Sequence, residues 1–434
     1  MKTTSSQEGA NINADILWDV VVVGGGPAGM MAAGRAAASG AQVLLLEKNP
    51  ILGKKLLITG GGRCNITNAE FDTRKLLSRF KGSDKFLFSA FSEWAVQETL
   101  DFFHSRQLLT KEEAEQRVFP ITEKASSVQQ TLIEYIKTGG VEVRFNAEVK
   151  GFVPEDSLHS DQKKINSVEL KDGTRILGKK FILATGGTSR PETGSTGDGF
   201  KWLKKIGHSV IDPTPSLVPV AVKDSWAKGL QGVTLPEVKI TLLQNNVKQE
   251  SKKGKILFTH FGISGPTILN LSKDIGELLK YGETVISLDL LPSLDYGKLN
   301  TRLQEVFKTN NGKKLKNCLD ELILSSLVDT VIEKSDISLD TFCHSVTRDE
   351  RLRLVTTLKH LNMTASHLLG TDKAIIASGG VVLEEIDFKT MQSRLYPNLY
   401  IIGDVLNIDR PSGGFSLQLC WTTGQVAGKS AGQS

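Results

Sequence analysis

The sequence contains few cysteines and no long apolar run. Its 434 residues include only Cys64, Cys318, Cys343 and Cys420, which are widely spaced and form no CxxC motif. This distribution indicates neither a disulfide framework nor a zinc site, and we expect no bound metal. No apolar run reaches the roughly 18 residues needed to cross a bilayer. We therefore expect no membrane partner.

The sequence also lacks a strong excess of charge of either sign. Its 53 basic and 48 acidic residues give a formal net charge of +5, and the basic residues form only short clusters, such as those in 252–255 and 313–316. Such a distribution is typical of a solvated surface, so we expect no nucleic-acid partner. Residues 1–15 are polar and lack an apolar signal core, which predicts a disordered tail. Together with the few cysteines, this favours a cytoplasmic protein.

A segment near the N-terminus has the pattern of a dinucleotide-binding unit. The apolar strand Val20–Val23 runs directly into a G-x-G-x-x-G turn formed by Gly24, Gly26 and Gly29. Pro27 stands near the start of a small-residue helix, where a missing N–H costs little. The N–H groups at such a helix start can receive the phosphates of a nucleotide.

The second strand of this unit, 43–46, ends at Glu47. A carboxylate at this point can accept hydrogen bonds from both ribose hydroxyls of an adenosine. It argues against a 2′-phosphate, so FAD or NAD is favoured over NADP. The alternative is a glycine-rich turn that binds no ligand. Strand, glycines, helix, strand and acid all occur in the expected order, and we therefore favour nucleotide binding.

A loop with three successive glycines follows. Gly60–Gly62 precede Arg63 and Cys64, and such glycines imply that something approaches the backbone closely. We interpret the loop as a segment that lies along a flavin ring, with a mobile turn as the alternative. A redox role for Cys64 needs a partner thiol, and none is adjacent in the sequence. A packed thiol beside the flavin is the favoured interpretation.

The sequence between this loop and the middle of the chain predicts helices and strands of one α/β domain. The predicted elements are a mainly helical stretch at 84–138 with a break at 117–120, a strand at 141–145 beside 43–46, a hairpin at 164–177, and a buried strand at 181–187. The last of these strands ends in small residues, which is typical of a strand beside a nucleotide.

The composition changes after residue 199 and indicates an inserted domain. Strands are predicted at 218–222, 238–243, 256–259 and 284–290, and helices at 267–279, 295–307, 315–333 and 348–361. Short strands followed by helices suggest a small β-barrel or sandwich with a helical appendage. The dense loop 258–266 contains His260, which could titrate near neutral pH, although a lone histidine is more often structural.

The end of the sequence returns to the first fold. A strand at 399–404 ends in Asp404, and Gly413 and Gly414 precede a last helix at 417–428. Asp404 can hold a ribityl hydroxyl. The helix start can present N–H groups to the flavin edge where negative charge develops on reduction. The alternative is a purely structural C-terminal segment.

Several motifs together resemble one known family. They are GGGPAG, GKKLLITGGGRCNITN, RVFP, ATGG, GSTGDG, LFTHFGISGP and IIGDVLNIDRPSGGFSLQ. They resemble the bacterial YhiN-type flavoproteins, also described as aminoacetone-oxidase-family or bile-acid-Δ4,6-reductase-like NAD(P)/FAD-dependent oxidoreductases. The resemblance spans nearly the whole chain after residue 15. It implies an α/β fold, namely a glutathione-reductase-type FAD-binding Rossmann domain with an inserted β-barrel-like plus helical domain.

The resemblance also implies how the chain is divided and which residues hold the cofactor. We expect the FAD-binding domain at 16–195 and 371–434, and an inserted substrate domain at 196–370. In the insert, the barrel-like part covers about 210–292 and the helical part about 293–365. The predicted cofactor-binding residues are Gly24, Gly26, Pro27, Ala28, Gly29, Glu47, Lys48, Lys55, Gly61, Arg63, Cys64, Asn65, Val149, Thr185, Gly186, Gly403, Asp404, Gly413, Gly414 and Phe415.

Two positions depart from the family pattern. Asp404 stands where many members have Glu, which is tolerable for a hydroxyl contact. Arg410–Ser412 replace the more usual Gly-x-Thr before the paired glycines, a change that can alter the flavin's edge.

The leading functional hypothesis is an FAD-dependent oxidoreductase that exchanges hydride between flavin N5 and a small organic substrate, such as an enone or steroid. The substrate is expected between the FAD domain and the insert, with an active-site shell of Arg63, Cys64, His260 and Ser264. No second strand–GxGxxG–helix unit occurs. NAD(P)H, the expected transient reductant, must therefore share the substrate cleft. The alternatives are an FAD-dependent tRNA-modifying enzyme and a non-catalytic redox sensor. The oligomeric state is left open between monomer and homodimer.

Overall fold

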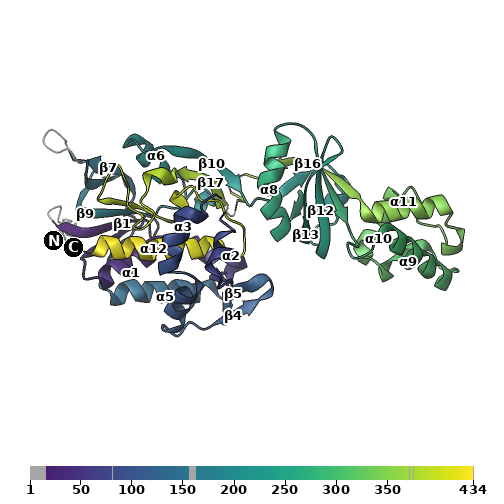
Figure 1. The fold of residues 1–434 in the computed structure, drawn as a ribbon, viewed down its shortest axis with the longest axis horizontal. Coiled ribbons are helices and arrows are strands. Elements are labelled where there is room, and N and C mark those ends of the chain that lie inside the picture. The colour runs from purple at the N-terminus through teal and green to yellow at the C-terminus, as the bar shows by residue number, and fades with distance from the viewer. Residues whose placement is uncertain (1–15, 81, 156–162, 371, 375, 434) are drawn as a thin grey trace, which may run out of the picture. The chain divides into compact units, whose positions relative to one another are not determined.

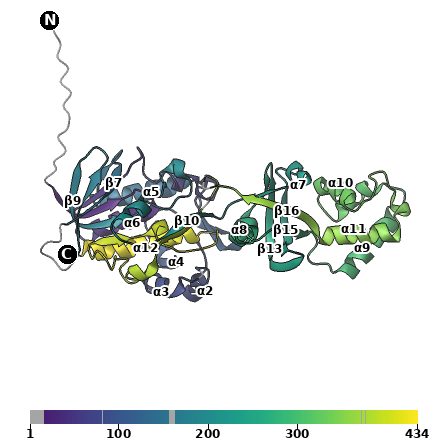
Figure 2. The same ribbon diagram turned by 90° about the horizontal axis from the view of Figure 1, so that it is seen from above.

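The chain forms two compact units in the computed structural model, which describes residues 16–80, 82–155, 163–370, 372–374 and 376–433. The expected disordered tail, residues 1–15, lies outside the described residues. The first unit comprises Met1–Thr214 and Ile376–Ser434, and the second comprises Pro215–Ile375. Each unit has a hydrophobic core of its own. Figures 1 and 2 show the two units from directions 90° apart.

The first unit is built on a seven-stranded sheet with a parallel centre. The strand order is β6-β2-β1-β9-β8-β7, and β18 also pairs with β9. The strands are β1 (Leu17–Val23), β2 (Val43–Leu46), β6 (Glu142–Arg144), β7 (Val149–Pro154), β8 (Ile165–Leu170), β9 (Arg175–Leu183) and β18 (Leu399–Ile401). The four central strands β2, β1, β9 and β18 run parallel to one another. Their apolar runs are typical of strands that are covered on both faces.

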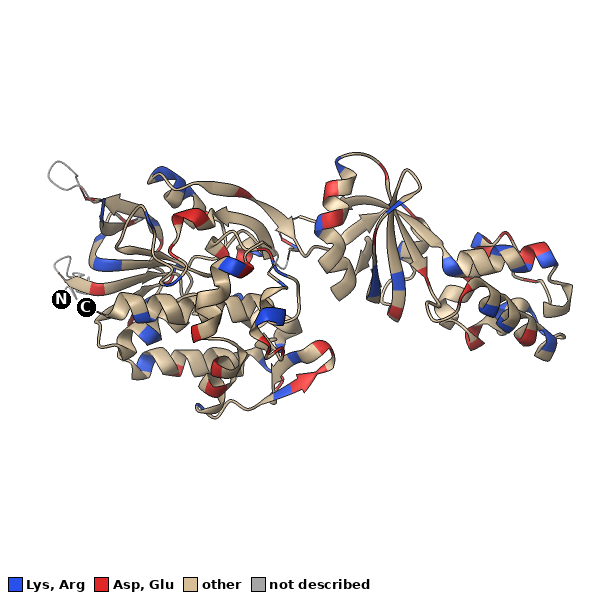
Figure 3. Cartoon of the chain, in the orientation of Figure 1, with Lys and Arg blue, Asp and Glu red and all other residues tan. Residues whose placement is uncertain are grey.

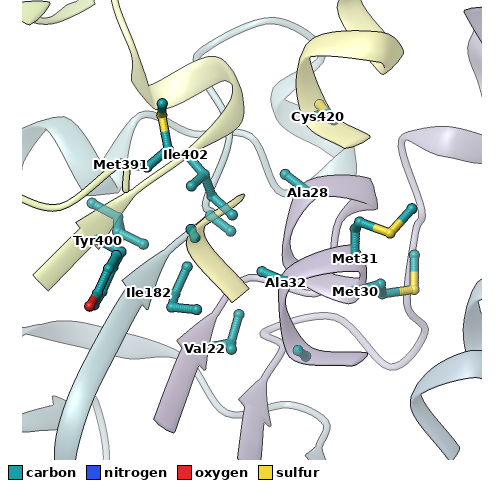
Figure 4. Packing of buried hydrophobic residues seen from close by; sticks show 14 of the residues in the cluster. Val22, Ala28, Met30, Met31, Ala32, Ile182, Met391, Tyr400, Ile402 and Cys420 are labelled. Carbon is teal, nitrogen blue, oxygen red and sulfur yellow. The ribbon is translucent and has the colours of Figure 1, made fainter. Parts of the chain in front are cut away.

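Helices surround this sheet. They are α1 (Pro27–Ala38), α2 (Thr73–Leu77), α3 (Asp84–Glu93), α4 (Val96–His104), α5 (Ala125–Thr138), α6 (Asp198–Lys205) and α12 (Phe415–Gly432). The helices α1, α5 and α12 lie together in Figure 1, and α1 contacts both of the others. Figure 4 shows the core beneath α1, where Ala28 and Ala32 share one buried cluster with Val22 and Ile182 of neighbouring strands.

Two small sheets complete the first unit. A three-stranded sheet has the order β3-β5-β4, and a two-stranded sheet pairs β10 with β17. Their strands are β3 (Thr67–Asn68), β4 (Thr110–Glu113), β5 (Arg117–Pro120), β10 (Val210–Ser216) and β17 (Ile376–Val381). The chain leaves the first unit along β10 and returns along β17, so both crossings use neighbouring strands.

The second unit contains a closed barrel and a group of helices. The barrel order is β11-β14-β13-β12-β15-β16. Its strands are β11 (Val220–Val222), β12 (Thr234–Gln244), β13 (Val247–Thr259), β14 (Gly262–Ser264), β15 (Thr284–Asp289) and β16 (Leu361–Leu368). The helices are α7 (Ser225–Gly229), α8 (Pro266–Leu279), α9 (Tyr296–Thr309), α10 (Ser325–Lys334) and α11 (Arg348–Lys359). Closure of the barrel removes the exposed strand edges that an open sheet would present.

The predicted fold class is confirmed, while several elements differ from the sequence prediction. The segments predicted as half of a hairpin and as a separate buried strand form the single strand β9, because its first residues pair with β8 and its last residues with β1 and β18. The break at 117–120 is strand β5. The helix α6 belongs to the first unit, whereas the insert was predicted to begin at residue 196, before this helix. The strand β16 follows the helices and closes the barrel.

Candidate functional site

Four parallel strands end together at one edge of the large sheet. In the register of the sheet, Val23 pairs with both Leu46 and Leu183, and Leu183 also pairs with Ile401. The residues that follow these positions are the glycine turn, Glu47, the Ala184–Gly187 segment, and the Gly403–Asp404 pair. In open α/β sheets, ligands bind at the carboxyl ends of the strands. The predicted nucleotide-binding segments from both ends of the chain therefore meet at this edge.

The glycine turn between β1 and α1 requires its glycines. Gly24 has φ +106°, and a Cβ at this position would lie 2.6 Å from the Ala184 carbonyl oxygen. A Cβ on Gly29 would lie 1.9 Å from the Gly24 carbonyl oxygen, so the helix packs against the turn itself. A Cβ on Gly26, by contrast, would meet no atom of the described residues within 4 Å. The open space lies at the N-cap of α1, where a pyrophosphate would bind.

Glu47 is buried and braces this turn. Its Oε2 accepts a hydrogen bond of 2.8 Å from the Gly25 N–H. Its Oε1 accepts hydrogen bonds from the backbone N–H of Asn49 at 2.8 Å and from Asn49 Nδ2 at 2.7 Å. A carboxylate has about four acceptor sites, so Glu47 keeps capacity for a ribose hydroxyl.

The helices α1 and α12 pack side by side and run in the same direction. A Cβ added to Gly424, Gly428 or Gly432 of α12 would lie 2.4–2.7 Å from the carbonyl oxygen of Ala28, Ala32 or Ala36 of α1, respectively. α12 begins nine residues before Gly424 and α1 begins one residue before Ala28. At 1.5 Å per residue, the two helix starts are therefore offset by about 12 Å along the pair. The packing therefore fixes the two positive helix ends relative to each other.

The segment after Cys64 is fastened to the start of α12. Trp421 Nε1 donates to the Ile66 carbonyl oxygen at 2.9 Å, and Thr67 Oγ1 donates to Gln418 Oε1 at 2.6 Å. Gly414 caps α12 with φ +101°, and a Cβ at this position would lie 2.3 Å from the Thr67 carbonyl carbon. The two segments that were predicted to lie beside the flavin are thus neighbours in the structure.

The triple-glycine loop carries a buried thiol. Cys64 has φ +63°, which is uncommon for a residue with a side chain. Burial raises the pKa of the Cys64 thiol to about 12, with a hydrogen bond to Thr59 acting in the opposite direction. Cys64 therefore carries its proton at neutral pH. This state agrees with a packed thiol and not with a thiolate nucleophile.

Arg63 turns toward the small three-stranded sheet. Its guanidinium forms two hydrogen bonds with the Glu113 carboxylate, at 2.9 and 3.2 Å, and lies 4.0 Å from the centre of the Phe119 ring. Glu123 Oε1 lies 3.6 Å from Arg63 Nη1 and also contacts Lys111. These nonlocal partners were not apparent from the sequence, and β4, which carries Glu113, was not predicted.

Asp404 lies between two cations at the end of β18. Lys55 Nζ is 3.6 Å from its Oδ2, and the Arg410 guanidinium contacts its Oδ1. Although burial acts to raise the pKa of Asp404, the two cations hold it below its ordinary value. Lys55 Nζ also contacts Ser189 Oγ at 2.5 Å. Asp404 is therefore a carboxylate at neutral pH, as the predicted hydroxyl contact requires.

Two predicted cofactor-binding residues present buried polar atoms without a partner. Among the described residues, Asn65 Oδ1 and Thr185 Oγ1 are buried and make no hydrogen bond. An unpaired buried polar group is costly, and such groups in a native structure call for an explanation. A polar ligand at this edge would satisfy them. These atoms, the open space at Gly26 and the acceptor capacity of Glu47 together fit FAD.

The remaining predicted cofactor-binding residues lie in the same unit. Lys48 Nζ bonds Thr196 Oγ1 at 2.7 Å and lies 3.2 Å from the Asp198 carboxylate. Phe415 is buried with its ring 6.0 Å from that of Phe80. The others are Pro27 and Ala28 in α1, Gly61 in the loop, Val149 at the start of β7, Gly186 after β9, Gly403 after β18, and Gly413 before α12.

His260 and Ser264 lie in the second unit. His260 follows β13, is exposed, and has its ring 4.9 Å from that of Phe261. Ser264 ends β14, where it pairs with Leu257. The structure thus brings Arg63 and Cys64 together in one unit, and His260 and Ser264 together in the other.

The described part of the chain shows no group of three or more His, Cys, Asp or Glu residues that could hold a metal ion. None of its described helices is both long and apolar enough to cross a membrane.

Comparison with known proteins gives the family. The model of the family described as "HI0933-like protein Rossmann domain" matches residues 18–430. The chain belongs to this family. It is 30% identical over 399 residues to a 3-dehydro-bile acid delta(4,6)-reductase from Clostridium scindens, covering 91% of this chain and 93% of the relative. It is 29% identical over 409 residues to a ribosomal RNA dihydrouridine synthase from Escherichia coli, covering 94% and 96%.

A solved structure supports the fold. The 3-ketosteroid delta1-dehydrogenase from Sterolibacterium denitrificans superposes with a TM-score of 0.53 at 13% identity, covering 96% of this chain and 99% of that chain. The predicted family is confirmed, and with it the α/β fold and the cofactor. The chain is an oxidoreductase of a Rossmann-fold flavoprotein family, and its cofactor is FAD.

Proposed function

We propose that this chain reduces a carbon–carbon double bond conjugated to a carbonyl group, with FAD supplying the hydride and NAD(P)H serving as reductant. One observation carries the proposal: the chain matches relatives with two different named activities over nearly their whole length. A 3-oxo steroid with delta(4,6) double bonds and a uracil ring both contain an electron-poor alkene beside a carbonyl. The two names therefore share one reaction on different substrates.

The residues of the first unit support this role by binding and orientation. Glu47 and the start of α1 would hold the adenosine and pyrophosphate, and Asp404 and the start of α12 would hold the other half of FAD. Of the predicted active-site shell, Cys64 can keep a proton but cannot act as a thiolate. His260 and Ser264 stay predicted members of the active-site shell.

The first candidate substrate is a small enone or steroid. The relative named as a bile-acid reductase, at 30% identity, favours it. NAD(P)H would use the same face of the flavin in alternation with this substrate, because the sequence shows no second dinucleotide-binding turn.

The second candidate substrate is a uracil base in RNA, against our expectation of no nucleic-acid partner. The relatives named as ribosomal RNA dihydrouridine synthases favour it. In the barrel, Lys239 of β12 directly opposes Lys253 of β13, and like charges in this position are destabilising. The neighbouring Asp289 is already paired with Lys359 at 2.7 Å. Charges of both signs are otherwise mixed over both units (Figure 3), so this pair is a candidate phosphate contact.

An anaerobic experiment tests the shared reaction. Purified protein is mixed with NADH or NADPH while the visible absorbance of the flavin is followed, and a 3-oxo-4,6-diene steroid or a simple enone is then added. We expect bleaching by one of the nucleotides, and return of the absorbance as one carbon–carbon double bond of the added substrate is reduced. A flavin that stays oxidised with both nucleotides would contradict the proposed reductant.

A second experiment separates the two substrates. Ribosomal RNA from a strain that lacks dihydrouridine is incubated with the enzyme and NAD(P)H and analysed for dihydrouridine by mass spectrometry. A Lys239→Gln/Lys253→Gln variant should lower the salt dependence of RNA binding by about two phosphate contacts while leaving enone reduction unchanged. RNA that is neither retained nor modified rejects the second candidate.

A further inference from the structure

Arg410 is a buried cation in the segment between β18 and α12. Its side chain is only 1% exposed. A buried guanidinium is costly unless it is paired and hydrogen-bonded. Arg410 meets this requirement with Asp404, which is itself a predicted cofactor-binding residue.

The guanidinium of Arg410 joins three segments of the chain. It contacts the Asp404 carboxylate after β18, donates from Nη1 to the Ile408 carbonyl oxygen at 2.7 Å, and donates from Nε to Ser416 Oγ at 3.0 Å. Ser416 lies in the first turn of α12. Arg410 therefore fixes the end of β18 relative to the positive end of α12. The planar fork of arginine is suited to such a bridge, whereas lysine offers a point charge.

These contacts group two cations around one carboxylate. Asp404 faces Arg410 on one oxygen and Lys55 on the other, so these three side chains together carry a charge of +1. The start of α12 adds its partial positive charge. In a partly buried site, charges interact several times more strongly than in bulk water.

We propose that Arg410 is a positioning residue that, with Asp404 and Lys55, makes the flavin end of the FAD site electropositive and so favours flavin forms with negative charge on the N1–C2=O edge. The inference rests on the proposed placement of FAD between the starts of α1 and α12. It adds a specific residue outside the predicted cofactor-binding set. The sequence Arg410–Ser412 was noted above as a departure from the family pattern that can alter the flavin's edge, without a role for Arg410 itself.

Sulfite binding tests this inference without turnover. The sulfur lone pair of sulfite forms a bond to N5 of oxidised flavin, and the displaced electron pair leaves a negative charge at the N1–C2=O edge. The affinity for sulfite, followed by bleaching of the flavin, therefore reports the local positive charge. The FAD-loaded wild-type protein should form the adduct readily. Arg410→Gln should raise the dissociation constant for sulfite at least tenfold and lower the reduction potential of the bound flavin.

Three further variants complete the test. Lys55→Gln removes another charge of the same cluster from a more exposed position. It should also raise the dissociation constant for sulfite, and it provides the test if Arg410→Gln fails to fold. Arg410→Lys keeps the positive charge but loses the planar fork, so it should recover the sulfite affinity only in part. Lys429→Gln removes a charge from the far end of α12, where Lys429 pairs with Glu93, and should behave as wild type.

The outcomes separate the two proposals. A wild-type protein that binds no FAD would overturn the placement of the cofactor. A wild-type protein that holds FAD but forms no sulfite adduct would overturn the role of the charge cluster. The role of the charge cluster would also be overturned if the Arg410→Gln and Lys55→Gln variants had full FAD occupancy and bound sulfite with wild-type affinity.

Discussion

At the scale of single residues, a substitution at Glu47 is the most demanding test of the nucleotide site. Its carboxylate accepts one hydrogen bond from Gly25, in the glycine turn, and two from Asn49. Glu47→Gln keeps the shape of the side chain but removes its charge. Because a hydrogen bond to a charged group contributes about 1.5–3 kcal/mol, we expect FAD binding to weaken at least about tenfold. Titration of the apoprotein with FAD measures the change.

The control for this prediction is Glu93→Gln, which makes the same chemical change at the surface contact with Lys429. It should bind FAD as wild type does. Equal affinities for Glu47→Gln and wild type would remove Glu47 from the site.

His208 gives a prediction about pH. Its Nδ1 contacts Glu385 at 2.6 Å, and its Nε2 contacts Ser393 Oγ at 2.9 Å. Ser393 Oγ already accepts the N–H groups of Leu395 and Tyr396, so its own hydrogen points toward Nε2, and His208 is neutral. Burial lowers the pKa of His208 below its ordinary value of 6.5, although Glu385 acts in the opposite direction.

The sign of the effect follows from proton binding. As the pH falls below about 6.5, the unfolded chain binds a proton at His208 before the folded chain does. This contribution to stability is therefore present above that pH and is lost on acidification. Thermal unfolding as a function of pH should show a smaller acid-side fall in Tm for His208→Gln than for wild type. Parallel curves would exclude the effect.

Residue-level prediction from the sequence is strongest where the signal is local. The glycine turn and Glu47 lie within one strand–helix–strand unit, so their spacing alone indicates their roles. The partners of Arg63 and the His208–Glu385–Ser393 contacts join residues far apart in the sequence. No local pattern marks such pairs, because they depend on how the elements pack.

At the scale of elements, the pairing of α1 with α12 positions both helix starts. Gly428→Ala places a methyl group 2.4 Å from the Ala32 carbonyl oxygen, so the helices must move apart. Overpacking of this kind costs about 1–3 kcal/mol, and we expect a lower free energy of unfolding together with weaker FAD binding. Chemical denaturation and FAD titration measure the two effects.

Gly229→Ala is the matched control, because a Cβ at Gly229 meets no atom of the described residues within 4 Å. Its stability and FAD affinity should match those of wild type. If Gly428→Ala behaves in the same way, the close approach of the two helices has no role in binding.

Elements with strong periodicity were predicted well. Strands whose limits depend on pairing with distant strands were not. The apolar run at 181–187 was separated from the hairpin, since nothing in the sequence shows that β9 changes partners along its length. The strand β16 was missed because it follows α11 directly and pairs with strands far back in the sequence. The glycines of α12, spaced four residues apart, are a signal that could have indicated its close packing.

At the scale of the whole molecule, the two separate cores predict independent folding. The chain enters and leaves Pro215–Ile375 on the neighbouring strands β10 and β17. A variant with this segment replaced by a short Gly/Ser linker should fold, bind one FAD and show no substrate turnover. Circular dichroism, flavin absorbance and activity measure these outcomes. A variant that folds but binds no FAD would assign part of the cofactor site to the insert.

The central claim is that the turn before α1 and the start of α12 hold the two ends of one FAD. The most direct measurement is the FAD content of the purified protein, determined by visible absorbance before and after incubation with added FAD. We predict one tightly bound FAD per chain, with occupancy reduced in both Glu47→Gln and Gly428→Ala. A protein that stays colourless after incubation with FAD would contradict the claim.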